Sequence, residues 1–281
     1  MSSADDDRSA ARRGPSRSDT PGLSRAFAHG HPALVVYLMA GYPDRGRSLE
    51  ALREVAAAGA DLIEVGVPYS DALADGPVIV RAANESMRAN DGFGLTEAIE
   101  LAAQFVADPG LDEPPPVALM TYLNPILRLG PEVIAERMRA GGVGGVIIPD
   151  MPPDVAEEWL CVARPRHLDT VFLVAPTSTP ERLSKAGEMS SGFVYAVSTT
   201  GVTGERSELS DEIEALVGRV RAFTTLPVAV GFGVSTPKQA EAIAGIADGV
   251  IVGSAIVKRQ HDLEEMAIFV RALADAVHST G

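Results

Sequence analysis

The chain has 281 residues, of which 46% are hydrophobic and 22% are charged, so its apolar content suffices for one large domain or two small ones. A formal net charge of -14 disfavours nucleic acids and anionic membrane surfaces as partners, because both are polyanions. The single cysteine, Cys161, excludes an intrachain disulfide framework and favours a reducing, cytoplasmic location.

The N-terminal segment, residues 1–24, combines charged residues with repeated serine, proline and glycine, so we expect a disordered tail. It lacks the apolar stretch of a secretory signal. No later run approaches the roughly 20 consecutive apolar residues that a membrane helix needs. We expect residues 25–281 to form one domain, because no later segment has the composition of a linker.

Short apolar runs rich in β-branched residues recur along the domain and predict buried strands. They cover residues 34–39, 62–67, 117–122, 146–149, 171–175, 193–198, 227–231 and 249–253. Amphipathic segments rich in Ala, Glu and Arg predict the helices, which cover residues 48–58, 77–89, 96–107, 132–140, 154–163, 211–222, 237–246 and 262–277.

This alternation of strands and helices predicts an α/β protein with a parallel sheet. Strands that are apolar on both faces belong in a sheet covered by helices, and eight strand-helix units favour a single (β/α)8 TIM barrel. Two helical segments separate the second and third strands, which predicts an extra helix after strand 2. The alternative is an open doubly wound sheet, whose G-x-G-x-x-G signature after the first strand is missing.

Glu64 is the most unusual residue of the predicted strands, because it lies between Ile63 and Val65 in an otherwise apolar run. A buried, unpaired carboxylate is costly or takes up a proton, so a functional role is indicated, although a structural ion pair is the alternative. Active sites of (β/α)8 barrels lie at the C-terminal ends of the strands. Other polar residues expected at this end are Asp75, Thr121, Asn124, Asp150, Thr177 and Tyr195.

Small residues mark the loops after the last three predicted strands. These loops contain Gly201-Val-Thr203-Gly204, Gly231-Phe-Gly233-Val-Ser235 and Gly253-Ser254. Small residues let backbone N–H groups approach a phosphate, and phosphate sites in this fold favour the loops after strands 7 and 8. The pattern therefore predicts a phosphate site, with tight turns as the alternative.

The lysines and histidines limit the types of reaction that the sequence allows. The three lysines lie in predicted helices or solvated positions, which disfavours a Schiff base. The histidines are scattered, and the pair His29-Gly-His31 lacks the further ligands of a closed zinc site, so we expect surface residues and no metal. This leaves proton transfer by carboxylates on a phosphorylated substrate, with a raised pKa at Glu64 while Asp75 stays ionised.

Several motifs follow one another at the predicted strand ends. They are Leu62-Ile-Glu64-Val-Gly-Val-Pro-Tyr-Ser-Asp71 with Leu73-Ala-Asp75-Gly-Pro77, Met120-Thr-Tyr-Leu-Asn-Pro125, Val146-Ile-Ile-Pro-Asp150, Ala175-Pro-Thr177, Gly192-Phe-Val-Tyr195, Gly201-Val-Thr-Gly204, Gly231-Phe-Gly233-Val-Ser-Thr-Pro237 and Gly249-Val-Ile-Val-Gly253-Ser254. From about Phe27 to Ala274 this series resembles the tryptophan synthase alpha subunit family.

The resemblance implies a lyase of tryptophan biosynthesis that cleaves indole-3-glycerol phosphate into indole and glyceraldehyde 3-phosphate by a retro-aldol step without a cofactor. It implies that Glu64 is the general acid and base and that Asp75 stabilises positive charge at the indole N–H. The residues implied to bind substrate are Tyr195, Thr203, Gly204 and Phe232, and those implied to bind phosphate are Gly204, Gly233, Gly253 and Ser254.

The resemblance also implies a tryptophan synthase beta subunit as partner, in an alpha2beta2 complex. One departure concerns this partner: Ala72 follows Ser70-Asp71 where the family usually has proline, in the loop that touches the beta subunit in the family. Proline would fix φ at this position. A stand-alone indole-forming lyase of a specialised pathway therefore stays an alternative, as does a non-catalytic phosphate-binding regulatory barrel.

Overall fold

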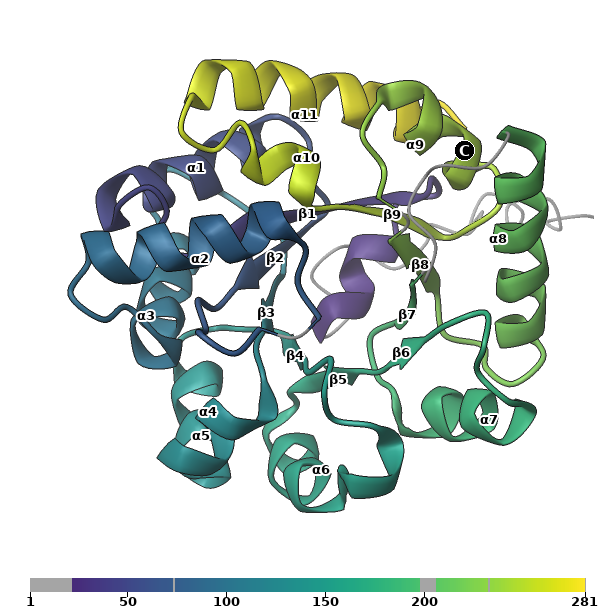
Figure 1. The fold of residues 1–281 in the computed structure, drawn as a ribbon, viewed down its shortest axis with the longest axis horizontal. Coiled ribbons are helices and arrows are strands. Elements are labelled where there is room, and N and C mark those ends of the chain that lie inside the picture. The colour runs from purple at the N-terminus through teal and green to yellow at the C-terminus, as the bar shows by residue number, and fades with distance from the viewer. Residues whose placement is uncertain (1–21, 73, 198–205, 232, 281) are drawn as a thin grey trace, which may run out of the picture.

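The computed structural model describes residues 22–72, 74–197, 206–231 and 233–280, which form a ring of parallel strands surrounded by helices (Figure 1). The strands are paired in the order β5-β4-β3-β2-β1-β9-β8-β7-β6. Their bounds are β1 Ala33–Met39, β2 Leu62–Gly66, β3 Val117–Met120, β4 Gly145–Ile147, β5 Asp169–Val171, β6 Leu173–Val174, β7 Val194–Val197, β8 Val228–Gly231 and β9 Gly249–Val252.

The ring closes at Phe172, which separates β5 from β6 by a single residue. β5 pairs with β4, and β6 pairs with β7, so the two short strands are halves of one barrel strand. The backbone N–H of Tyr195 also donates to the carbonyl of Phe172 at 3.1 Å. The predicted α/β class and (β/α)8 barrel are thus confirmed, with one of the eight predicted strands divided in two.

Helices cover the outside of the ring in Figure 1. They are α1 Arg45–Ala57, α2 Pro77–Ala89, α3 Leu95–Val106, α4 Leu123–Leu129, α5 Pro131–Ala140, α6 Glu157–Ala163, α7 Pro180–Met189, α8 Arg206–Arg221, α9 Pro237–Ala244, α10 Ser254–Val257 and α11 Leu263–His278, with short 3-10 helices η1 Gly22–Phe27, η2 Pro153–Val155 and η3 Arg164–Arg166. Both α2 and α3 separate β2 from β3, which confirms the extra helix after the second strand.

Local sequence signals explain where several helices begin. Pro77 occupies the first turn of α2, where its missing N–H needs no partner. The Asp262 carboxylate accepts a hydrogen bond from the N–H of Glu265 at 3.0 Å and so caps α11. No helix among the described residues is long and apolar enough to cross a membrane.

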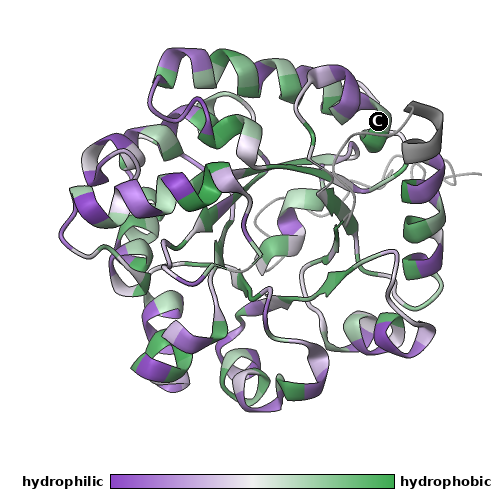
Figure 2. Cartoon of the chain, viewed as in Figure 1, coloured by the Kyte–Doolittle hydropathy of each residue, from purple (hydrophilic) through white to green (hydrophobic). Residues whose placement is uncertain are grey.

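Alternate residues along each strand divide the core in two. In β1, Leu34, Val36 and Leu38 pack outward against the helices, whereas Val35 faces the barrel interior. Hydrophobic residues accordingly gather on the strands and on the inner sides of the helices, as the hydropathy colouring of Figure 2 shows. By the same alternation in β2, Ile63 and Val65 pack outward, so Glu64 belongs to the inward set.

The first described residues already belong to the fold, earlier than the predicted domain start at residue 25. Residues 22–24, which were expected in the tail, begin η1, while residues 1–21 lie outside the described part. Leu23 is fully buried and packs with Val35, Leu62 and Phe193 in the interior cluster. A single leucine in a polar segment carries no periodicity, so the sequence could not indicate that this residue closes the bottom of the barrel.

Candidate active site

Glu64 lies in the middle of β2 and faces the interior of the barrel. Its Cα is paired in register with Tyr37 on β1 and with Ala118 on β3. The side chain is fully buried, and neither carboxylate oxygen has a hydrogen-bond partner among the described residues. The described residues therefore form no ion pair with Glu64, which was the alternative that the sequence left open.

Burial sets the protonation state of Glu64. Loss of solvation, followed by repulsion from the Asp75 carboxylate, raises the pKa of Glu64 to about 8. The carboxyl group is therefore mostly protonated at neutral pH and can donate a proton. A group in this state suits a general acid, because its pKa lies near the operating pH.

Asp75 lies on the loop between β2 and α2, on the same side of the barrel as Glu64. Loss of solvation raises the pKa of Asp75 to about 6, and a hydrogen bond with the Tyr122 side chain acts in the opposite direction. Asp75 is therefore mostly ionised at neutral pH. The two carboxyl groups are held in different protonation states, as the sequence predicted, which allows one to act as an acid and the other as an anion.

A cavity of about 360 Å³ joins these carboxyl groups to the glycine-containing loops after β8 and β9. It is lined by Tyr37, Glu64, Ala74, Asp75, Gly76, Ile79, Met120, Pro149, Leu173, Tyr195, Val197, Gly231, Gly233, Ile251, Gly253 and Ser254. The lining is mainly apolar, with carboxyl groups on one side and small residues on the other. Such a cavity fits a substrate with a flat apolar part and an anionic end.

The predicted phosphate residues divide between described and undescribed parts of the chain. Gly233, Gly253 and Ser254 all line the cavity. Gly233 has a φ of +64°, a backbone conformation that disfavours a side chain and favours glycine. Thr203, Gly204 and Phe232 lie outside the described residues.

Apart from Tyr195, the other polar residues predicted at the strand ends do not line the cavity, and two of them form hydrogen bonds in the loops around it. The Asp150 carboxylate accepts a hydrogen bond from the N–H of Leu123 at 2.9 Å, at the start of α4. The Asn124 amide donates to the Tyr69 hydroxyl at 2.9 Å. Thr177 is exposed, and Thr121 is buried beyond β3, and neither lines the cavity.

Two tyrosines of the site were missed by the sequence reasoning. Tyr37 lines the cavity next to Glu64, and its ring lies over Gly66, where a Cβ atom would collide with the hydroxyl. Tyr195, which was predicted, lies over Gly231 in the same way. Burial raises the pKa of both hydroxyls well above their usual value, so they stay neutral. The signal that could have found Tyr37 is its inward position two residues after Val35 in β1.

The second missed tyrosine, Tyr122, follows β3. Its hydroxyl accepts a hydrogen bond from the N–H of Ala74 at 3.0 Å and hydrogen-bonds the Asp75 carboxylate. Tyr122 therefore holds the loop that carries Asp75. Its ring also packs on Tyr69, with 5.3 Å between the ring centroids.

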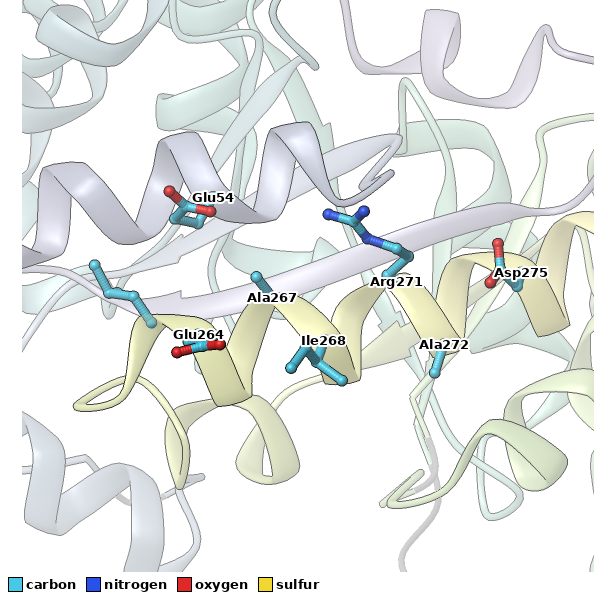
Figure 3. Close-up of a pocket in the computed structure, with 8 residues that line it drawn as sticks. Glu54, Glu264, Ala267, Ile268, Arg271, Ala272 and Asp275 are labelled. Atoms are coloured by element: carbon cyan, nitrogen blue, oxygen red, sulfur yellow. The ribbon is translucent and has the colours of Figure 1, made fainter.

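A larger hollow, of about 630 Å³, lies on the outer wall of the barrel between α1 and α11. Figure 3 shows its labelled lining, in which Glu54, Glu264, Arg271 and Asp275 are the charged residues. Its four charged residues are all exposed, so the hollow lacks the buried carboxyl group found in the barrel mouth. Although it is larger, it is a poorer candidate for the active site than the cavity around Glu64.

Comparison with known proteins identifies the family of this chain. The family model described as tryptophan synthase alpha chain matches residues 23–278. The tryptophan synthase alpha chain of Synechocystis is 44% identical over 255 residues, which cover 88% of this chain and 94% of that protein. The alpha chain of Mycobacterium tuberculosis is 45% identical over 241 residues, covering 84% of this chain and 85% of its own.

Solved structures give the same result. A chain of M. tuberculosis tryptophan synthase superposes with a TM-score of 0.84 and 42% identity, covering 92% of this chain and 99% of that chain. The tryptophan synthase subunit alpha of Legionella pneumophila superposes with a TM-score of 0.82 and 29% identity, covering 92% and 97%. The chain therefore belongs to the tryptophan synthase alpha chain family.

Proposed function

We propose that this protein is a lyase of tryptophan biosynthesis that cleaves indole-3-glycerol phosphate into indole and glyceraldehyde 3-phosphate. The observation that carries the proposal is the state of Glu64, a fully buried carboxyl group with a pKa of about 8 at the wall of the cavity. Cleavage needs a proton at the carbon that leaves, and a buried acid beside an apolar cavity can supply it.

In the proposed reaction Glu64 donates its proton to C3 of the indole ring. The bond between C3 and the glycerol carbon then breaks, and its electron pair stays with the indole. Glu64 takes up the proton of the hydroxyl on that glycerol carbon, which becomes the aldehyde of glyceraldehyde 3-phosphate. The proton given and the proton received balance, so Glu64 returns to its starting state.

Asp75 would act on the other part of the substrate. Protonation at C3 creates positive charge that the ring shares with the indole nitrogen, and an ionised carboxylate near the N–H stabilises it. A pKa of about 6 keeps Asp75 ionised at neutral pH. Tyr195 would line the indole side of the cavity, and we keep Thr203, Gly204 and Phe232 as further substrate-binding residues by their match to the family motif.

The phosphate would lie between the late loops. Gly233 and Gly253 would offer backbone N–H groups and Ser254 would add a hydroxyl, and Gly204 is kept in the set by its match to the family motif. Gly233, Gly253 and Ser254 line the cavity that contains Glu64, and Gly204 is outside the described residues. Because the net charge of -14 repels an anion, local donors of this kind are needed to hold the substrate.

We also propose a tryptophan synthase beta subunit as partner, in an alpha2beta2 complex in the cytoplasm. Family membership supports this partner, and the similar M. tuberculosis chains are those of tryptophan synthase. The stand-alone lyase and the non-catalytic barrel receive no comparable support. The non-catalytic alternative also leaves the buried Glu64 without a purpose.

The test is a steady-state assay of indole release from indole-3-glycerol phosphate, with and without a tryptophan synthase beta subunit. We expect indole from the chain alone and a faster rate with the beta subunit. Glu64→Gln keeps the shape of the side chain and removes the acid, so we expect at least about a 100-fold loss of turnover with an unchanged circular dichroism spectrum.

The matched control is Glu54→Gln, which removes a carboxylate from the larger outer hollow and should leave turnover unchanged. Activity of Glu64→Gln within about tenfold of the parent would overturn the role of Glu64. Failure of the parent chain to release indole, even with the beta subunit present, would overturn the reaction. If the chain releases indole but the beta subunit does not raise the rate, the proposed lyase activity stands and the proposed partner is overturned.

A further inference from the structure

Three side chains with metal-ligating atoms meet at the end of the barrel away from the cavity. Asp61 directly precedes β2, His31 lies two residues before β1, and His278 is the last residue of α11. Asp61 and Glu64 are three residues apart on one strand, so the two sites are separated by roughly 10 Å along β2. The cluster is thus a feature of the barrel bottom and takes no part in the cavity.

The spacing of the ligand atoms fits a small metal ion. One ligand atom each from His31, Asp61 and His278 lies within 4.8 Å of the others. One of these separations is 2.8 Å, between His278 Nε2 and Asp61 Oδ2. Ligands of a tetrahedral zinc ion, at about 2.0–2.2 Å from the metal, are about 3.3 Å apart, a value inside this range. The spacing of the three ligand atoms is therefore compatible with a common ion.

Hydrogen bonds outside the cluster orient two of the three ligands. His31 Nδ1 lies 3.0 Å from the carbonyl oxygen of Pro32, which can only accept, so Nδ1 carries the proton and Nε2 keeps its lone pair. Asp61 Oδ2 accepts the N–H of Leu34 at 2.8 Å. Support of this kind fixes the tautomer of a ligating histidine and the orientation of a ligating carboxylate.

Burial adds to the case for a site. Asp61 is 5% exposed, and the ring of His31 packs on that of His278 with 4.1 Å between centroids. A third imidazole, that of His29, borders the group, with Nε2 3.8 Å from Asp61 Oδ1. His29 and His31 are partly exposed, and folding brings Asp61 and His278 to the pair, two neighbours that the sequence analysis did not connect with it.

We propose that His31, Asp61 and His278 form a binding site for a divalent transition-metal ion, most suitably Zn²⁺. Imidazole nitrogens with a carboxylate oxygen are a donor set that zinc favours over magnesium or calcium, which prefer oxygen alone. On binding, the Nε2 proton of His278 that now faces Asp61 is released or moves to Nδ1, and Nε2 coordinates the metal. The net negative charge of the chain favours a cation.

The ligands come from the two ends of the described chain, so a bound ion would join α11 to the entry of β1 and β2. A ligand that binds only the folded state raises its stability. We therefore expect Zn²⁺ to raise the thermal unfolding midpoint while leaving indole release unchanged, since none of the three residues lines the cavity.

The test uses the purified full chain, freed of metal with a chelator and titrated with Zn²⁺ against a chromophoric competitor. Co²⁺ is used as a spectroscopic probe, because a tetrahedral site with nitrogen and oxygen ligands gives intense visible bands. We expect one Zn²⁺ per chain, and affinity weakened at least about tenfold in both His31→Gln and His278→Gln. His261→Gln, which changes an exposed histidine outside the cluster, is the matched control and should bind as the parent does.

Parent-like affinity in either His31→Gln or His278→Gln would overturn the site, as would a parent chain that binds no more Zn²⁺ than these variants do. The proposal would also fall if bound Co²⁺ gave only the weak spectrum of an octahedral hydrated ion. A cluster that merely joins α11 to the barrel by a hydrogen bond would produce these results. Both substitutions are at partly exposed positions, and circular dichroism verifies that each variant is folded before titration.

Discussion

The backbone N–H of Ala74 donates a hydrogen bond to the hydroxyl of Tyr122 at 3.0 Å, and this contact fastens the loop after β2 to the chain after β3. The same hydroxyl hydrogen-bonds the carboxylate of Asp75, the next residue of the loop. One side chain therefore positions the loop and favours the ionised form of its carboxyl group. Tyr122 is a positioning residue in the proposed site.

Replacing Tyr122 tests this role. In Tyr122→Phe the hydroxyl is lost, so we expect the pKa of Asp75 to rise above its present value of about 6. The acidic limb of the pH profile of kcat/KM should move to higher pH, and kcat/KM at neutral pH should fall by about tenfold. Tyr69→Phe, on the ring that packs against Tyr122, is the control. A profile with an unmoved acidic limb would contradict the role.

The two carboxyl groups should respond differently to amide substitution. Glu64→Gln removes the only proposed proton donor, whereas Asp75→Asn removes charge but keeps a hydrogen-bond acceptor. We expect Asp75→Asn to lose turnover strongly but less than Glu64→Gln. Single-turnover rates of indole release measure the comparison directly. The assignment of roles would be reversed if Asp75→Asn were the more impaired variant.

The activity should have a bell-shaped dependence on pH. Asp75 must be ionised, so kcat/KM should rise with pH through about 6, and Glu64 must be protonated, so it should fall above about 8. In Asp75→Asn the rise near pH 6 should disappear, and the fall should move to lower pH, because the Asp75 charge contributes to the raised pKa of Glu64. Initial rates across this range check both limbs, and a profile that keeps increasing past pH 9 would argue against Glu64 as acid.

Stability should also depend on Glu64. Its pKa is about 8 in the folded chain and near 4.5 without the fold, so the folded state keeps a proton that the unfolded state releases between these values. Unfolding then releases protons, and the free energy of unfolding falls as pH rises through this range. We expect Glu64→Gln to reduce that decline in urea unfolding measured from pH 5 to pH 8. An equally steep decline in the variant would contradict the burial of a protonated Glu64.

Leu23 offers a test of the barrel bottom. The residue is fully buried against Val35, Leu62 and Phe193, so Leu23→Ala should lower the free energy of unfolding by about 2–5 kcal/mol. Leu127 is 50% exposed on α4, and Leu127→Ala should change the free energy of unfolding by less than about 0.5 kcal/mol. Equal effects of the two substitutions in denaturant unfolding would show that η1 adds nothing to the core.

Periodic features were the part of the fold that the sequence predicted best. The helix expected over residues 77–89 has those bounds in the structure, because Pro77 marks its start and the apolar spacing continues for three turns. Glu64 was recognisable because a carboxylate within an apolar strand has few structural explanations. The short helices α4 and α10 were missed, since seven and four residues carry too little periodicity to be distinguished from loops.

Features formed by residues that are far apart in the chain could not be predicted from the sequence. The metal-ligand cluster joins residues 31, 61 and 278, and no local spacing links them. Tyr122 and Asp75 are likewise brought together only when neighbouring strands align their C-terminal ends. The division between β5 and β6 depends on which neighbour each half pairs with, and the run of residues 171–175 carries no sign of it.

The closure of the sheet at Phe172 has a consequence for the behaviour of the protein at high concentration. β5 is bonded to β4 on one side and receives the N–H of Ser191 at the carbonyl of Thr170 on the other, so its backbone groups are engaged on both sides. An open sheet ends in strands that can recruit a foreign strand and start aggregation. A closed ring has no unpaired edge strand with which another chain could pair. Self-association through backbone pairing would therefore require the barrel to open first.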